Sequence, residues 1–72
     1  MPLVTSDAIA QIEYDEAVRT LFVRFTSGEW YAYLNVSALV YAAFVAAESH
    51  GRFFQDRVRD RYVYRGPLAL PA

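Results

Sequence analysis

Apolar and polar residues alternate along the first half of the chain in the pattern of half-buried β-strands. Over residues 8–15 every even position is apolar and most odd positions are polar, whereas over residues 20–25 every odd position is apolar. Residues 15–19 connect these two segments, and residues 29–34 alternate again after a turn that contains glycine. The pattern predicts three consecutive strands that pair as an antiparallel β-meander.

The turn between the second and third strands decides which side chains share a face of the sheet. A two-residue loop would put Ser27 at positive φ, which serine tolerates poorly. A three-residue loop over residues 26–28 needs positive φ only at its glycine. We therefore prefer the longer loop, which pairs Val23 with Tyr31. Because side chains alternate along a strand, Tyr31 then shares the face of Val23, and Trp30 lies on the opposite face.

After residue 34 the hydrophobic period changes from that of a strand to that of a helix. Asn35 or Ser37 is suited to cap the first predicted helix, because both side chains accept hydrogen bonds from backbone amides. The predicted apolar side of this helix comprises Leu39, Val40, Phe44 and Ala47.

A second helix is predicted over about residues 51–60, with Ser49 as its cap. Residues 61–65 are a candidate short final strand, which Gly66 and Pro67 end. The predicted fold class is α+β: a three-stranded antiparallel β-meander followed by two helices packed on one sheet face, with this short C-terminal strand as an addition.

The chain is 72 residues long, which is enough for one small domain. Residues 1–66 form the single predicted domain, and residues 67–72 form a predicted flexible C-terminal tail. The longest apolar run, over residues 38–47, is about half as long as a membrane span requires. The first residues lack the basic start and long apolar run of a signal peptide, so we expect a cytoplasmic protein without a membrane partner.

No catalytic constellation is present in the sequence. The chain has one histidine and no cysteine, which excludes the usual zinc ligand sets. The neighbouring carboxylates of Asp15 and Glu16 fall in a connecting loop, and no phosphate-binding glycine loop is found. We therefore expect a protein that is not an enzyme, with no catalytic residue, no cofactor and no metal.

Tyr31 and Tyr33 are two positions apart, so they share one face of the third strand. Ring-bearing residues at this spacing either pack in a small core or form a platform on which bases stack. The preferred turn points both rings toward the helices, and we interpret them as structural core tyrosines.

The opposite face of the sheet is the candidate interaction face. Large contiguous apolar patches are uncommon on monomers, and tryptophan and arginine favour interfaces. Our first interpretation is self-association as a homodimer. Burial under the final strand or tail, and contact with nucleic acid, are the alternatives. The residues of this candidate face are Phe22, Arg24, Trp30 and Ala32.

Charge is distributed unevenly along the chain. Residues 1–48 contain six acidic residues and two arginines, a net charge of −4, and residues 49–72 contain five arginines and two aspartates, a net charge of +3. All the basic residues are arginine, which recognises phosphate and carboxylate groups better than lysine. The candidate anion or RNA contacts in the basic part are Ser49, His50, Gly51, Arg52, Arg57 and Arg59.

The same residues also have a structural interpretation. Ser49 and Gly51 are suited to an elbow between two helices, with Ser49 as the cap and Gly51 relieving crowding. Our first interpretation of the arginines is a solvated helix face. The overall net charge of −1 argues against strong non-specific binding of nucleic acid.

An ordered series of residues resembles the KTSC domain family over about residues 6–65. The series is Gly28, Tyr31, Tyr33, Val36, Tyr41, Ala47, Ser49, Gly51, Phe54, Arg59 and Tyr62. That family is named for an extension at the C-terminus of some lysyl-tRNA synthetases, and it also occurs as small free-standing bacterial proteins. The resemblance implies a role in RNA or tRNA binding. The chain departs from the family at Ser37, where the family commonly has proline.

These observations lead to two functional hypotheses. The first is a small non-enzymatic interaction domain that binds a partner through a sheet face or through the arginine-bearing second helix. The alternative is an RNA-binding or tRNA-binding domain.

Overall fold

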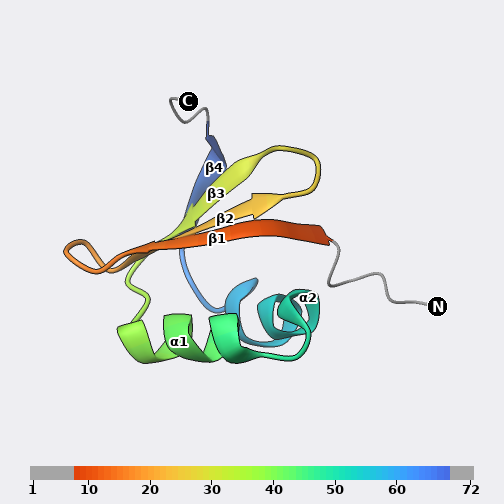
Figure 1. Ribbon diagram of the computed structural model, residues 1–72. Coiled ribbons are helices and arrows are strands. Elements are labelled where there is room, and N and C mark those ends of the chain that lie inside the picture. The colour runs from red at the N-terminus through yellow and green to blue at the C-terminus, as the bar shows by residue number, and fades with distance from the viewer. Residues whose placement is uncertain (1–7, 69–72) are drawn as a thin grey trace.

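The fold is a small α+β domain in which a four-stranded antiparallel sheet carries its helices on one face (Figure 1). The computed structural model describes residues 8–68. The strands follow one another in the sheet in chain order, β1-β2-β3-β4. The elements are β1 (Ile9–Asp15), β2 (Thr20–Phe25), β3 (Trp30–Tyr33), α1 (Ala38–Ala46), α2 (His50–Phe53), the π-helical segment η2 (Phe54–Val58) and β4 (Tyr64–Leu68).

The predicted meander and its register are confirmed. Val23 pairs with Tyr31, as the three-residue loop requires. The Phe25 amide donates to the Glu29 carbonyl at 2.9 Å, and the Gly28 amide donates to the Phe25 carbonyl at 2.8 Å. Gly28 has a φ of 98°, in the region that favours glycine. Side chains of β2 and β3 therefore alternate between the two faces as predicted.

The final strand exists, but it lies three residues later than predicted. β4 pairs with β3 at the edge of the sheet, and Gly66 and Pro67 lie inside it. An edge strand tolerates proline because the missing amide can fall on the unpaired side. Gly66 also lets β4 approach β3 closely, since a Cβ there would lie 2.6 Å from the Tyr31 ring. β4 continues through Leu68, past the predicted domain end at residue 66, and residues 69–72 of the predicted tail lie outside the described residues.

Both predicted helix caps are present. The Ser37 hydroxyl accepts a hydrogen bond from the Val40 amide at 3.3 Å, and the Ser49 hydroxyl accepts one from the Arg52 amide at 3.2 Å. The second helical segment runs over residues 50–58, slightly shorter than predicted, and its second half is π-helical. The inclusion of Leu39 in the apolar side of α1 was wrong.

Leu39 is 83% exposed, while Val40 and Phe44 of the same helix pack in the core. Successive helical residues are about 100° apart, so the face that contains Val40, Phe44 and Ala47 leaves Leu39 to one side.

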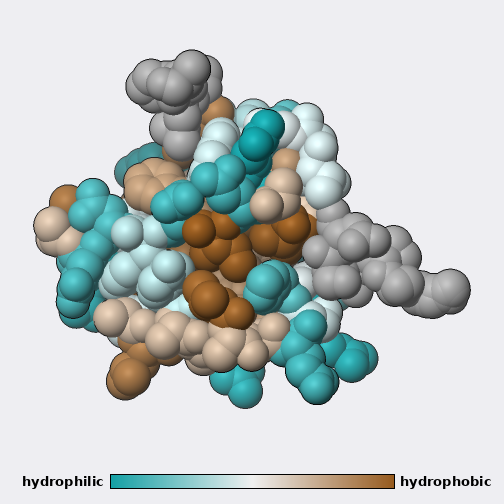
Figure 2. Space-filling view, in the orientation of Figure 1, coloured by the Kyte–Doolittle hydropathy of each residue, from teal (hydrophilic) through white to brown (hydrophobic). Residues whose placement is uncertain are grey.

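The core lies between the sheet and the helical segments. Its residues are Leu21, Val23, Tyr33, Val36, Phe44, Phe54 and Val58. Tyr14 joins the two layers, because its ring stacks on Tyr41 at 4.8 Å and its hydroxyl donates to the Val36 carbonyl. Apolar side chains reach the surface between β1 and α1 (Figure 2), where Ile9, Ile12 and Val45 line a shallow depression.

Candidate functional site

The face of the sheet opposite the helices holds all four residues of the predicted interaction face. Ala32 is 5% exposed, Phe22 and Trp30 are half-buried, and Arg24 is exposed. Within residues 8–68, both helical segments lie on the other face (Figure 1). β4 extends the sheet sideways and does not cover this face, so the predicted alternative of burial under the final strand is wrong. The predicted alternative of burial under the tail falls on residues 69–72, outside the described residues.

Two rows of side chains cross this open sheet face from β1 to β4. We define the open sheet face by the residues of these rows. The first row is Glu13, Phe22, Ala32 and Arg65, and the second row is Gln11, Arg24, Trp30 and Leu68.

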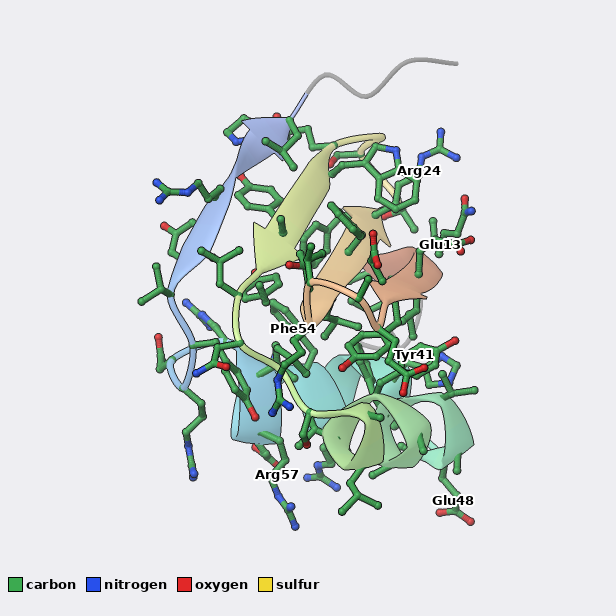
Figure 3. The ribbon with its side chains drawn as sticks, turned by 90° about the vertical axis from the view of Figure 1, so that its left-hand side faces the viewer. Glu13, Arg24, Tyr41, Glu48, Phe54 and Arg57 are labelled. Atoms are coloured by element: carbon green, nitrogen blue, oxygen red, sulfur yellow. The ribbon has the colours of Figure 1, made fainter. Side chains whose placement is uncertain are left out.

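Charge and apolar groups are ordered along the first row. Its carboxylate lies at the β1 edge, its guanidinium at the β4 edge, and its two apolar side chains between them. The Gln11 amide donates to the Glu13 carboxylate at 2.8 Å, and Figure 3 shows Glu13 and Arg24 directed away from the helices. The sequence pattern missed Glu13 and Arg65, because their place in a row depends on the register of both edge strands.

The arginines of the C-terminal part do not share one surface. Arg57 lies over the Phe53 ring at 5.8 Å and points away from the sheet (Figure 3). Arg52 borders the same helical surface, whereas Arg59 lines a cleft between the sheet and η2, and Arg65 lies on the open sheet face.

The segment that contains Ser49, His50 and Gly51 forms an elbow between α1 and α2. The Ser49 hydroxyl caps α2, and the His50 Nε2 lies 3.1 Å from the Val45 carbonyl oxygen. The His50 ring also contacts Phe44 edge to face, and Gly51 is buried. The polar groups of this segment are thus engaged within the chain, which supports the structural interpretation.

A cleft lined by aromatic rings opens between the β3-β4 end of the sheet and η2. Its volume is about 440 Å³. We call it the tyrosine cleft, and its aromatic and cationic lining is Phe25, Tyr31, Tyr33, Phe54, Tyr64 and Arg59. The sequence pattern missed this cleft, because Tyr64 joins the other rings only through the pairing of β4 with β3.

Tyr33 is a core residue, as predicted, and it also lines the tyrosine cleft. The residue is 4% exposed, and its ring packs edge to face on Phe54 at 5.5 Å. Burial, together with the nearby Tyr31 and Tyr64, raises the pKa of Tyr33 to about 12, and Arg59 offsets part of this effect. Tyr31 is half-buried and packs against the same core.

The raised pKa of Tyr33 predicts a loss of stability in alkaline solution. Between its ordinary value of 10.0 and its folded value of about 12, the unfolded chain releases this proton and the folded chain retains it. The free energy of unfolding should therefore fall as the pH rises through this window, by about 1–3 kcal/mol. The chain has no lysine, so tyrosine titration dominates the window.

Urea unfolding at several pH values from 9 to 12 measures this effect. The experiment must resolve differences of ~1 kcal/mol in the free energy of unfolding. Tyr33→Phe should flatten the fall, and Tyr62→Phe should keep it because Tyr33 is still present. An equally steep fall in Tyr33→Phe would show that another group is responsible.

In residues 8–68, none of the helices has the length and apolar character needed to cross a membrane. Over the same range, no three or more histidine, aspartate or glutamate side chains are grouped so that they could hold a metal ion.

Comparison with known proteins places this fold in a family. A sequence profile of the KTSC domain matches residues 5–62. A protein of Tsukamurella paurometabola is 42% identical over 62 residues, which are 86% of this chain and 92% of that protein. The crystal structure of a KTSC domain protein from Yersinia pestis has a TM-score of 0.78 and 33% identity, with 90% of each chain covered. The chain therefore belongs to the KTSC domain family.

Proposed function

We propose that this domain is a non-enzymatic interaction domain whose open sheet face binds a second copy of the chain. The observation that carries the proposal is the order of groups in the first row of that face. The row runs from a carboxylate through two apolar side chains to a guanidinium. A surface with opposite charges at its two ends and apolar groups between them is complementary to itself when one copy is turned over.

The strand register allows the pairing across such a contact to be worked out. A twofold axis that runs along the strands, between β2 and β3, places β1 of one copy over β4 of the other. Glu13 then faces Arg65 of the second copy, and the large Phe22 faces the small Ala32. Sheets that pack face to face keep their strands within about 30° of each other, so this arrangement is a common one.

The second row supports the same axis. Arg24 and Trp30 are directly paired on neighbouring strands. The twofold operation places Arg24 of each copy over Trp30 of the other, which suits stacking of a guanidinium on an indole ring. An axis perpendicular to the strands that crosses the first row would instead place Glu13 over Glu13, and like charges there would oppose association.

RNA or tRNA binding is the alternative function. The neighbouring Arg24 and Trp30 side chains favour it, because a base can stack on an indole ring beside a positive charge. The distribution of the remaining arginines over several surfaces makes one continuous phosphate-binding track less favourable. We therefore place self-association first.

Trp30→Lys should convert the dimer to a monomer. The change would place an ammonium group at the centre of the contact against Arg24 of the second copy, and buried like charges oppose association. Sedimentation of the wild type and the variant over about 1–500 μM protein measures the result, a range that covers weak and moderate dimers. Leu39→Lys is the matched control, because Leu39 is an exposed apolar residue on the helix side.

The wild type should show a mass that rises with concentration toward twice the chain mass, and the control should behave in the same way. Far-UV circular dichroism checks that Trp30→Lys remains folded. A wild type that stays monomeric throughout would contradict self-association. Salt-sensitive binding of mixed tRNA by that monomer, weakened by Arg24→Gln, would support the alternative.

A further inference from the structure

The tyrosine cleft lies on the helix-covered face of the sheet, so it is separate from the proposed dimer contact. Its floor is a continuous set of packed rings. Phe54 contacts Phe25 at 5.3 Å and Tyr33 at 5.5 Å, both edge to face. A volume of about 440 Å³ is within the range of small-molecule sites, which are mostly apolar with a few well-placed polar groups.

The polar groups of the cleft include a cluster of hydrogen-bond donors. The Tyr64 ring lies 5.9 Å from Tyr31 and 5.8 Å from Tyr33, so the three phenol groups come from adjoining positions on β3 and β4. Arg59 adds a guanidinium from the segment that follows η2. Three hydroxyl groups and a guanidinium in one cleft are suited to bind the oxygens of a carboxylate or phosphate.

Charged groups of both signs line the cleft. Glu29 and Asp60 also line the cleft, but the charged side chain that acts on the Tyr33 hydroxyl is Arg59. A tyrosine hydroxyl keeps its proton at neutral pH, so the Tyr33 hydroxyl can donate a hydrogen bond there.

We propose that the tyrosine cleft binds a small ligand in which a carboxylate or phosphate is attached to a flat ring. Arg59 and the hydroxyls of Tyr31, Tyr33 and Tyr64 hold the oxyanion. The flat ring lies against the Phe25 and Phe54 side chains. This ligand class fits the cleft because it matches donors at one end and aromatic carbon at the other.

Four probes that differ in one property each test this proposal. Benzoate and phenyl phosphate share a ring and differ in the oxyanion, benzylammonium has the same ring with a positive charge, and inorganic phosphate has no ring. Each is titrated into the full chain up to about 50 mM, which detects even millimolar affinity. The readout is the NMR shift of the tyrosine and phenylalanine ring signals of the cleft. Trp30, on the opposite face, reports non-specific effects.

Benzoate, phenyl phosphate or both should bind more tightly than inorganic phosphate, and benzylammonium should bind least. Tighter binding of phenyl phosphate would assign the natural ligand to phosphate esters, and tighter binding of benzoate would assign it to carboxylates. Benzylammonium binding as tightly as the anions, or no saturable shift with either aromatic anion, would overturn the proposal.

Two pairs of variants locate the binding. Arg59→Gln should weaken the better aromatic anion about tenfold or more, because it removes charged hydrogen bonds. Arg61→Gln is its control, since Arg61 lines a different depression. Tyr64→Phe should weaken binding a few-fold, and Tyr62→Phe, outside the cleft, should not. Equal losses in Arg59→Gln and Arg61→Gln would show general charge attraction and contradict the assignment.

Discussion

Phe54→Ala should unfold the domain or bring it close to unfolding. Phe54 is 8% exposed. It belongs to η2, and its ring packs edge to face against Phe25 and Tyr33 of the sheet. Removing a buried phenylalanine ring costs about 3–5 kcal/mol, through lost burial and the cavity that remains. A domain of this size has a total stability of only about 4–11 kcal/mol, at roughly 0.05–0.15 kcal/mol per residue. The substitution therefore removes a large part of the total.

Urea unfolding followed by circular dichroism measures this loss. Leu39→Ala is the control, because Leu39 is an exposed apolar residue whose truncation should change stability by about 0.5 kcal/mol or less. A loss below about 1 kcal/mol for Phe54→Ala would show that the ring does not hold η2 against the sheet.

The sheet register could be predicted because one local feature decided it. Only Gly28 in the turn tolerates positive φ without strain, and that restriction selected the three-residue loop. The loop fixed which residues of β2 and β3 share a face. It therefore grouped Arg24 with Trp30 and separated both from Tyr31, as the structure confirms.

The position of β4 could not be predicted from the sequence, because its partner strand is distant along the chain. A short run of aromatic and β-branched residues lies between Arg61 and Arg65, and Gly66-Pro67 has the composition of a strand end. Pairing with β3 at the sheet edge decides the outcome, and the edge tolerates both residues. The tyrosine cleft and the first row of the open sheet face both depend on this pairing, which is why sequence patterns gave only parts of them.

The helix boundaries and caps were more predictable than the helix faces. Ser37 and Ser49 act locally, so their cap positions follow from neighbouring residues. Leu39 was assigned to the wrong side of α1, because its apolar character alone does not show which face meets the sheet. Tertiary packing through Phe44 and the stacked Tyr41 decides that face.

Reversing the charge of Glu13 or Arg65 should weaken the proposed dimer strongly. Each residue faces the other across the twofold axis, and the axis repeats the contact, so one substitution changes two contacts. Glu13→Arg would replace the two attractions by two repulsions between arginines. Arg65→Glu would replace them by two repulsions between glutamates. Exposed pairs are individually weak, at about 0–1 kcal/mol each, but two losses with added repulsion should raise the Kd roughly tenfold or more.

Combining both reversals should restore the dimer. Arg at position 13 and Glu at position 65 would again face opposite charges, with the order along the row reversed. Restoration distinguishes a direct contact from a general effect of charge or fold, because each single variant alters the net charge and the double variant does not. Arg61→Glu is the control for a charge reversal outside the open sheet face.

Sedimentation equilibrium of the wild type, the two single variants and the double variant is the most direct test of self-association through the open sheet face. We predict a concentration-dependent dimer for the wild type, a Kd raised about tenfold or more in each single variant, and a Kd within about threefold of the wild type in the double variant. A wild type that stays monomeric at every concentration, or a double variant that dissociates at least as readily as the single variants, would contradict the proposed contact.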